Sequence, residues 1–202
     1  MNDQIKQLQL EVFEAKQKLR EAIGSAAPEP VEDWELMRLD GTAVKISELF
    51  GDHTELLVIH NMGRGCHYCS LWGDAMIGIA DHLQQRCGFV LCSNDEPESI
   101  AEFREVRGWS YPCVSGAGSG FAKAMGYMED GGRALPGVSA FHRNEDGTIV
   151  RTGDSPFGPG DDFCGVWPML DMIQGGKGEW EPTHGRVDLF CSGDENSPCR
   201  CS

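Results

Sequence analysis

The chain has 202 residues, 40% of them hydrophobic, and its 17 Lys and Arg against 32 Asp and Glu give a net charge of −15. This charge repels phosphate backbones and anionic lipid surfaces within a Debye length, so we expect no nucleic-acid and no membrane partner. The length suits one core domain with appended ends.

The first residues, Met1 to Lys6, lack the basic stretch and the unbroken apolar core of a secretory signal. Nowhere do about 18 apolar residues follow one another, so no membrane span is predicted. The nine cysteines are an odd number at irregular positions, which does not match a small secreted disulfide framework. We therefore expect a cytoplasmic protein whose cysteines are mostly reduced.

Residues 5–23 are predicted to form an amphipathic helix. Its apolar residues recur in steps of three and four with Lys, Gln and Glu between them; they are Ile5, Leu8, Val12, Ala15, Leu19 and Ala22. Such a face either packs on its own domain, which we favour for so short a repeat, or pairs with a second chain to form a homodimer. Residues 24–30, rich in Ala and Pro, are predicted to be a linker.

Extended segments lead from this linker to the first motif. Residues 34–39 alternate with period two and continue, after an Asp-Gly turn, into a short segment at 44–49, as expected of an edge hairpin. Residues 56–60 are almost continuously apolar, which is typical of a strand covered on both faces. The motif Cys66-x-x-Cys69 follows this strand and precedes a helical pattern.

The rest of the chain alternates between helical and extended patterns. Helices are expected at residues 69–86, from about 97 onward, at 120–125 and at 163–173, and extended segments at 88–92, 109–115, 138–142 and 148–151. The last two strands flank an Asp-Gly turn and are predicted to form a hairpin. This alternation predicts an α/β layer structure. From residue 175 onward no periodicity remains, and a tail is expected.

The Gly-rich segment at residues 116–120 lacks the Lys of a phosphate-binding P-loop. We expect a turn there, with Ser119 capping the next helix. The sequence also lacks paired carboxylates that would nominate an acid and a base, and it has no Gly-x-Ser-x-Gly elbow. A hydrolase is therefore not expected.

Two cysteines separated by two residues can close a small disulfide ring or bind one metal ion, and their place before a helix favours redox chemistry. Free N–H groups and the macrodipole at a helix N-terminus stabilise a thiolate, so the pKa of Cys66 is expected to fall to about 3.5 to 7.5. Positive charge from His67 and Arg64 is expected to contribute. Cys69, one turn further on and less exposed, is expected to be the resolving thiol. Tyr68 is expected to form a wall of the substrate surface.

The predicted order of elements resembles the thioredoxin superfamily. It consists of a strand, Cys-x-x-Cys at the head of a helix, further strand and helix units, and a proline before a hairpin and a last helix. The segment Ala134-Leu135-Pro136-Gly137-Val138 matches that family's cis-proline loop, which implies that Pro136 shapes the groove for an extended substrate. A bacterial thioredoxin-like family known only as a domain of unknown function, related to the alkyl-hydroperoxide-reductase (AhpC/TSA) class, is a closer resemblance. The motifs that carry it are Gly65-Cys66-x-x-Cys69-Ser70-Leu71-Trp72, Phe103-Arg104, Gly108-Trp109, Leu135 to Phe141 and Leu170-Asp171.

The resemblance covers roughly residues 30 to 180 and implies a thioredoxin-like α/β fold, in which helices flank a central mixed sheet. We expect an N-terminal helix and linker over residues 1–30, the thioredoxin-like domain over 31–175 and an irregular C-terminal tail over 176–202. The implied function is that of a thiol–disulfide oxidoreductase without a cofactor. Its substrate would be a disulfide-containing protein or a small thiol, with an external thiol reductant as partner. Peroxidase activity is not expected, because Asn61 to Gly65 lacks the Pro and Thr that shape a peroxidatic pocket.

Other functions remain open for the same two thiols. Half of a zinc site would need further ligands, for which Cys191, Cys199 and Cys201 of the tail are candidates. A copper site would use a distant imidazole such as that of His142. The tail thiols can alternatively act as extra resolving thiols, and the fold can also serve as an interaction scaffold with an idle dithiol.

The four remaining cysteines, Cys87, Cys92, Cys113 and Cys164, lie among apolar neighbours in the sequence. A cysteine in such surroundings usually behaves as a small buried hydrophobe, so we expect these thiols to fill space in the core.

Overall fold

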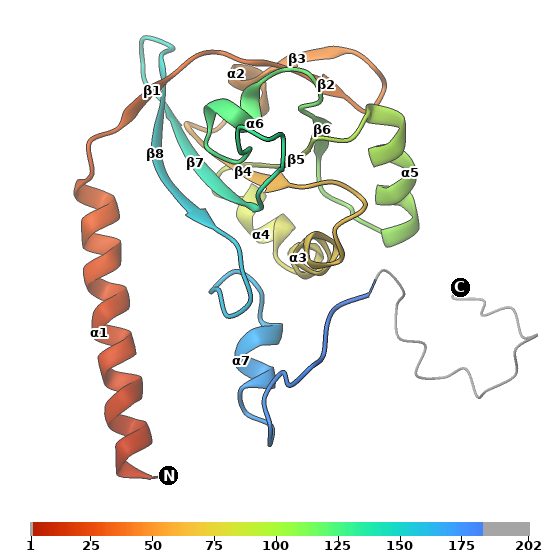
Figure 1. Ribbon diagram of the computed structural model, residues 1–202. Helices are drawn as coiled ribbons and strands as arrows, with labels where there is room; N and C mark the ends of the chain where they lie inside the picture. Colours follow the sequence, from red (N-terminus) through yellow and green to blue (C-terminus); the bar gives the residue numbers. More distant parts are fainter. Residues whose placement is uncertain (1, 184–202) are drawn as a thin grey trace, which may run out of the picture.

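The computed structural model describes residues 2–183, and its centre is one eight-stranded mixed sheet (Figure 1). The strands are β1 (Glu29–Val31), β2 (Glu35–Arg38), β3 (Ala43–Lys45), β4 (Glu55–Asn61), β5 (Gly88–Ser93), β6 (Cys113–Ser115), β7 (Gly137–Arg143) and β8 (Ile149–Pro156). The helices are α1 (Asp3–Ser25), α2 (Ile46–Leu49), α3 (His67–Ile77), α4 (Ala80–Gln84), α5 (Pro97–Arg107), α6 (Phe121–Ala124) and α7 (Val166–Leu170). The predicted α/β architecture, a mixed sheet flanked by helices, is confirmed.

The strands lie in the order β1-β8-β7-β4-β5-β6-β2-β3. The neighbours β4, β5 and β6 run parallel to one another, and all other pairs are antiparallel. β4 lies between β5 and β7, with His60 paired to Cys92 on one side and to Gly137 on the other. The carboxyl ends of β4 and β5 and the amino end of β7 therefore meet at one edge of the sheet.

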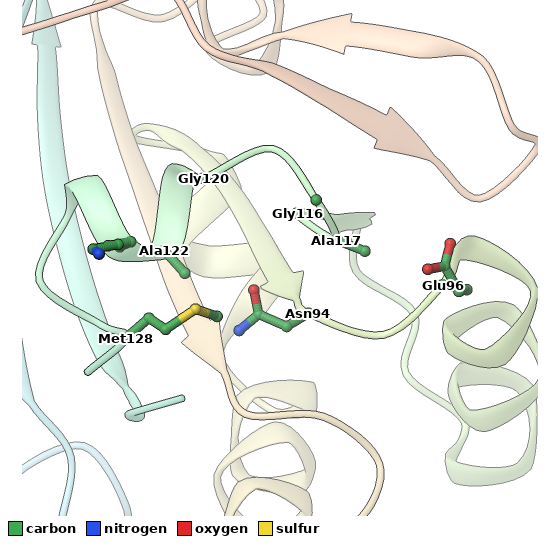
Figure 2. A pocket seen from close by; sticks show the side chains of 9 residues that line it. Asn94, Glu96, Gly116, Ala117, Gly120, Ala122 and Met128 are labelled. Carbon is green, nitrogen blue, oxygen red and sulfur yellow. The ribbon is translucent and has the colours of Figure 1, made fainter. Parts of the chain in front are cut away.

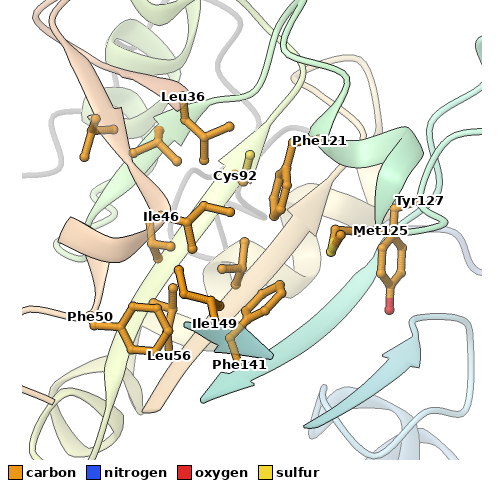
Figure 3. Packing of buried hydrophobic residues seen from close by; sticks show 14 residues of the cluster. Leu36, Ile46, Phe50, Leu56, Cys92, Phe121, Met125, Tyr127, Phe141 and Ile149 are labelled. Carbon is orange, nitrogen blue, oxygen red and sulfur yellow. The ribbon is translucent and has the colours of Figure 1, made fainter. Parts of the chain in front are cut away.

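Each face of the sheet is covered by its own hydrophobic cluster, because successive side chains of a strand point to opposite faces. On β4, Leu56 and Val58 join the cluster under α2 and α6, and Ile59 joins the cluster under α3, α4 and α5. Figure 3 shows the first cluster, in which the rings of Phe121 and Phe141 lie near one another. A central strand buried on both faces explains the almost continuous apolar run at 56–60.

The packing of α3, which carries the dithiol, is secured by a polar contact with the chain around α5. The Asp74 carboxylate on α3 accepts hydrogen bonds from Arg107 Nε and Trp109 Nε1, both at 2.9 Å. Gly73 lets the Trp109 ring lie against the helix, since a Cβ there would come within 2.3 Å of it. The Arg107 side chain is only 7% exposed, and the Asp74 carboxylate provides an opposite charge for its buried guanidinium.

Most predicted elements are present, and two helices are shorter than expected. The predicted helix at 69–86 is interrupted near Gly78, because Ile79 has the non-helical angles φ −120 and ψ −13. The predicted helix at 163–173 is confined to α7. Its first residues instead form a turn in which the Asp161 carboxylate accepts hydrogen bonds from the N–H groups of Phe163 and Cys164.

The predicted linker at 24–30 is partly wrong, since its last residues open strand β1, which pairs antiparallel with β8. Pro30 cannot donate a backbone hydrogen bond and is tolerated because β1 is an edge strand. The carboxylate of Glu29 pairs with the Arg151 guanidinium across the two strands at 2.5 Å. The domain boundaries after residues 30 and 175 stay predictions.

The N-terminal helix α1 does not pack on the sheet, so the favoured prediction of docking is wrong. None of its residues is buried, and Figure 1 shows its C-terminal end near β8 while the rest of the helix extends away from the sheet. Its contacts with the rest of the chain include Ile23, near Gly153, and Lys16, whose Nζ lies 2.6 Å from the Asp162 carboxylate. No helix within residues 2–183 is both long and apolar enough to cross a membrane.

Candidate functional site

The dithiol lies on a tight turn that joins the carboxyl end of β4 to the start of α3. The side chain of Asn61, the last residue of β4, accepts a hydrogen bond from Gly63 N–H at 2.8 Å. The N–H of Cys66 then donates to the Gly63 carbonyl at 3.1 Å and closes the turn. Cys66 is the N-cap of α3, with extended backbone angles. The two cysteines therefore follow strand β4, and Cys66 directly precedes the first residue of α3.

Asp95 holds this turn from the neighbouring strand. Its carboxylate accepts hydrogen bonds from the Arg64 backbone N–H at 2.6 Å and from the Ser93 hydroxyl at 3.2 Å. Gly63 has φ +116 and passes so close that a Cβ there would lie 2.7 Å from the carboxylate. Asp95 follows β5, which is parallel to β4, so its position depends on the sheet order. Sequence reasoning missed it, because only the strand neighbours reveal the contact.

Cys66 is the accessible thiol of the pair. It is half-buried, and its Sγ accepts a hydrogen bond from the Cys69 backbone N–H at 3.2 Å. A hydrogen bond from the Cys69 thiol, together with the N–H groups of Cys69 and Tyr68, lowers the pKa of Cys66 to about 6 and outweighs the opposing effect of burial. A pKa lowered in this way favours the thiolate form of Cys66 at neutral pH.

Cys69 has the opposite character. Only 2% of it is exposed, and its pKa is raised well above the ordinary thiol range by the hydrogen bond to Cys66, by burial and by the negative charge of Cys66. The two thiols thus differ in both accessibility and charge. Cys66 is the accessible thiolate, and Cys69 is a buried thiol that donates a hydrogen bond to it.

The prediction that the positive charge of Arg64 contributes to the lowered pKa of Cys66 is wrong. Its guanidinium points to α5, where Nη1 lies 3.1 Å from the Glu102 carboxylate and 3.3 Å from the Ser99 hydroxyl. His67 is exposed at the first position of α3. Hydrogen bonds rather than a neighbouring cation lower the pKa of Cys66.

Tyr68 belongs to an aromatic group that covers the side of α3. Its ring lies 6.0 Å from Trp72 and 6.1 Å from Trp167, measured between centroids. Trp72 donates from Nε1 to the Asp161 carboxylate at 2.8 Å, which fixes the turn before α7 against the helix. Burial, followed by the nearby Glu181 carboxylate, raises the pKa of Tyr68. The segment from residue 157 to 181 therefore forms a wall beside the dithiol helix.

Pro136 lies at the same edge of the sheet as the dithiol, because the next residue, Gly137, pairs with His60 near the end of β4. The cis peptide bond that the resemblance implied before Pro136 is wrong. No cis bond occurs in residues 2–183, so the bond before Pro136 is trans. The trans form is the intrinsically preferred one for an X–Pro bond. In this geometry the Pro136 carbonyl accepts a hydrogen bond from Phe157 N–H at 3.0 Å, and Leu135 N–H donates to Tyr127.

The copper alternative with His142 is contradicted by the fold. His142 pairs with Glu55 at the start of β4, and its Nδ1 lies 2.9 Å from the Glu55 carboxylate. At about 3.3 Å per strand residue, it lies roughly 20 Å from the end of β4 that leads to the dithiol. Within residues 2–183 no group of three or more His, Cys, Asp or Glu side chains is arranged to hold a metal ion. The tail candidates Cys191, Cys199 and Cys201 lie outside the described residues.

The other four described cysteines are free and buried, as predicted; they are Cys87, Cys92, Cys113 and Cys164. Burial is the largest cause of the raised pKa at each of them, and it brings those of Cys92 and Cys113 to about 12. Cys66 is thus the only thiol in the described part of the chain with a lowered pKa.

A pocket of about 340 Å³ opens at the carboxyl ends of β5 and β6, one strand away from the dithiol turn. Its lining consists of Asn94, Glu96, Gly116, Ala117, Gly118, Gly120, Ala122, Lys123 and Met128. Figure 2 shows the Asn94 and Met128 side chains near one another, with Ala122 on α6 and Glu96 at the start of α5. The Gly-rich segment is a turn, as predicted, but the N-cap of α6 is Gly120 and not Ser119. Ser119 Oγ accepts a hydrogen bond from Phe121 N–H at 3.1 Å within this turn.

Comparison with known proteins identifies the fold. A family model described as "Bacterial protein of unknown function (DUF899)" matches residues 31–190. No curated protein matches the sequence. Among solved structures, peroxidoxin BcpB from Mycobacterium tuberculosis is similar, with 23% identity over 64% of this chain and 84% of its own and a TM-score of 0.52.

Two further solved structures have the same architecture. Reduced Prx3 from Vibrio vulnificus in complex with H₂O₂ has 18% identity over 67% of this chain and 90% of its own, with a TM-score of 0.55. The mitochondrial 2-Cys peroxiredoxin from Plasmodium falciparum has 12% identity over 66% and 83%, with a TM-score of 0.51. These likenesses confirm the predicted thioredoxin-like fold.

Proposed function

Because this chain belongs to the DUF899 family and has a thioredoxin-like fold, with an asymmetric dithiol at the head of α3, we propose that it is a thiol–disulfide oxidoreductase. The observation that carries this proposal is the pairing of a half-buried thiol of lowered pKa, Cys66, with the buried thiol Cys69. Thiolates, not thiols, attack disulfides, so this difference supports Cys66 as the attacking thiol and Cys69 as the resolving thiol.

In the reductive direction the Cys66 thiolate attacks one sulfur of a substrate disulfide. A bond forms between Cys66 and that sulfur, and the other substrate sulfur leaves as a thiolate. Cys69 then loses its proton and attacks the Cys66 sulfur, which forms the Cys66–Cys69 disulfide and releases the second substrate thiolate. Two electrons pass to the substrate, and an external thiol reductant reverses the exchange at the protein to restore both thiols.

The surface around Cys66 supports a substrate with an extended main chain. Pro136 lies beside the end of β4, and the aromatic wall with Tyr68 borders the dithiol helix on another side. The pocket at 94–128 is lined largely by Gly and Ala, which leave backbone groups accessible to a bound chain. We propose a disulfide-containing protein or a small disulfide as substrate. A cytoplasmic location, where thiol reductants are abundant, stays a prediction.

The test is a redox titration of the full chain in glutathione buffers, read by differential alkylation and mass spectrometry. We expect a reversible two-electron Cys66–Cys69 disulfide. Cys66→Ser should abolish reduction of a model protein disulfide, and Cys69→Ser should accumulate the mixed disulfide at Cys66. Cys87→Ser, which removes a buried thiol in the connection between α4 and β5, is the matched control and should retain activity.

Full disulfide-reducing activity in Cys66→Ser would refute the proposal. So would stoichiometric zinc or copper that is lost when both thiols are replaced, since that result favours a metal-binding module. Peroxide consumption is measured in parallel, because the structural relatives include peroxiredoxins. Peroxide-driven turnover that needs Cys66 but no disulfide substrate would replace the proposed reaction with peroxidase chemistry.

A further inference from the structure

The N-terminal helix presents an apolar face that the rest of the described chain leaves uncovered. α1 has 23 residues and none is buried. The side chains on this face are about half exposed, with Ile5 at 48%, Leu8 at 52%, Val12 at 53% and Leu19 at 58%. These side chains remain in water in a single copy of the chain, so their burial would have to come from another molecule.

The spacing of this face matches a coiled-coil seam. Placing Ile5 at heptad position a puts Ile5, Val12 and Leu19 at a positions and Leu8, Ala15 and Ala22 at d positions, in unbroken steps of three and four. A repeat of 3.5 residues, rather than 3.6, keeps the stripe facing a second helix along its whole length. An isolated helix of this length is marginal in water, and most helical stability comes from packing of the apolar face.

We propose that α1 pairs with α1 of a second copy of this chain as a parallel, in-register, two-stranded coiled coil. β-branched residues at a with Leu at d favour two parallel strands, and Ile5, Val12 and Leu8 follow this rule in the first half of the seam. The alanines at d in the second half allow the two helices to approach closely. Like residues then face one another across a two-fold axis.

The charges beside the seam fit the same arrangement. In a parallel pair, each g position faces the e position of the next heptad on the other helix. Glu11 at g faces Lys16 of the second copy, and this opposite-charge contact occurs twice by symmetry. The remaining g–e pairs, Gln4 with Gln9 and Lys18 with Ile23, bring no like charges together. In one copy alone, Lys16 contacts Asp162 and Glu11 accepts a hydrogen bond from Gln7.

This arrangement places both sheet domains at the same end of the coiled coil, because each chain leaves its helix at residue 26 and enters β1 at Glu29. The proposal does not depend on the redox function. It concerns a surface on the side of β8, and the dithiol can act or be idle in either oligomeric state.

The matched controls are two exposed apolar residues of α1 that lie off the seam. Leu10, 50% exposed, takes position f, and Phe13, 54% exposed, takes position b. We expect light scattering of the full chain to give twice the monomer mass at micromolar concentration. Val12→Glu should give the monomer mass, and Leu10→Glu should keep the dimer. Since α1 contributes no buried residue, the near-ultraviolet circular dichroism of both variants should match the parent.

A monomeric parent protein would overturn the proposal, as would a trimer or an equal loss of the dimer in Leu10→Glu. Orientation is tested with Ile5→Cys under mild oxidation, followed by peptide mass spectrometry. Two residue-5 thiols face one another only in a parallel pair, whereas an antiparallel pair places residue 5 near residue 22 of the other helix. Gln7→Cys, on the outer side of the helix, is the control and should not cross-link. A dimer that yields no link between the two residue-5 thiols would refute the parallel arrangement.

Discussion

The carboxylate of Asp95, just beyond β5, accepts a hydrogen bond from the backbone N–H of Arg64 at 2.6 Å and so fixes the turn that carries Cys66. The contact joins the carboxyl ends of two parallel neighbouring strands. It also places a negative charge near Cys69, where it contributes to the raised pKa of that thiol. One side chain outside the Cys-x-x-Cys motif thus holds the turn that carries the dithiol and makes a minor contribution to the raised pKa of Cys69.

Asp95→Ala should destabilise the protein by about 2 kcal/mol, because a charged acceptor of two hydrogen bonds is lost. Asp95→Asn keeps an acceptor without the charge and should cost less. Both are measured by urea unfolding of the reduced protein. Glu98→Ala, which removes an exposed carboxylate nearby on α5, is the control. Equal effects of Asp95→Ala and Glu98→Ala would show that Asp95 does not hold the turn.

Gly63→Ala should destabilise the protein by about 1 to 3 kcal/mol and slow the reaction of Cys66 with disulfides. At φ +116 an alanine is strained, and its Cβ would lie 2.7 Å from the Asp95 carboxylate. Gly65→Ala is a matched control two residues along the same turn, where an added Cβ meets nothing within 4 Å. It should change stability by less than about 0.5 kcal/mol. Similar unfolding midpoints for the two variants would contradict this account.

The sequence was sufficient to predict the elements that depend on local pattern. The buried strand at 56–60, the hairpin around the Asp-Gly turn and the dithiol at a helix start all follow from residue types a few positions apart. The same holds for the buried thiols such as Cys92, whose neighbours in the chain are apolar.

What the sequence could not predict depends on strand order and on the balance between competing contacts. Asp95 lies 31 positions from Arg64 in the chain, so its role appears only once β5 is placed beside β4. β1 contains a proline and has no alternating pattern, and it forms because β8 offers an open edge. Arg64 is next to the motif in sequence, yet its guanidinium pairs with Glu102 instead.

The burial of His60 predicts that the folded protein loses stability at mildly acidic pH. It is buried on β4, its ring stacks on Tyr127 at 4.0 Å, and its Nε2 lies 2.9 Å from the Ser139 hydroxyl. Burial, with a smaller effect of Arg151, lowers its pKa from 6.5 to about 3. Between these values the unfolded chain binds a proton that the folded protein does not. The stability present above pH 6.5 should therefore fall by up to about 1.4 kcal/mol per pH unit as the pH decreases towards 3.

His60→Gln isolates this effect, because glutamine does not titrate and keeps a hydrogen-bonding group towards Ser139. The variant should lose part of its stability at neutral pH, and its stability should depend less steeply on pH between 6.5 and 4. His82→Gln, at an exposed position, should leave the pH dependence of the parent unchanged. Urea unfolding at several pH values measures all three proteins. An unchanged slope in His60→Gln would show that other groups cause the acid sensitivity.

The lowered pKa of Cys66 predicts how its reactivity changes with pH. The thiolate is the nucleophile, so the rate of alkylation by iodoacetamide should rise with pH around a midpoint of about 6, well below the value of about 8.5 for an ordinary thiol.

The hydrogen bond from the Cys69 thiol is the largest cause of the shift. Cys69→Ala removes this donor and should raise the midpoint of the alkylation rate measurably above that of the parent protein. Cys69→Ser retains a hydroxyl donor and should raise it less. The rates are followed by mass spectrometry of the peptide that contains Cys66. If the midpoint of Cys69→Ala equals that of the parent, the backbone N–H groups at the start of α3 alone stabilise the thiolate, and the proposed coupling between the two thiols is wrong.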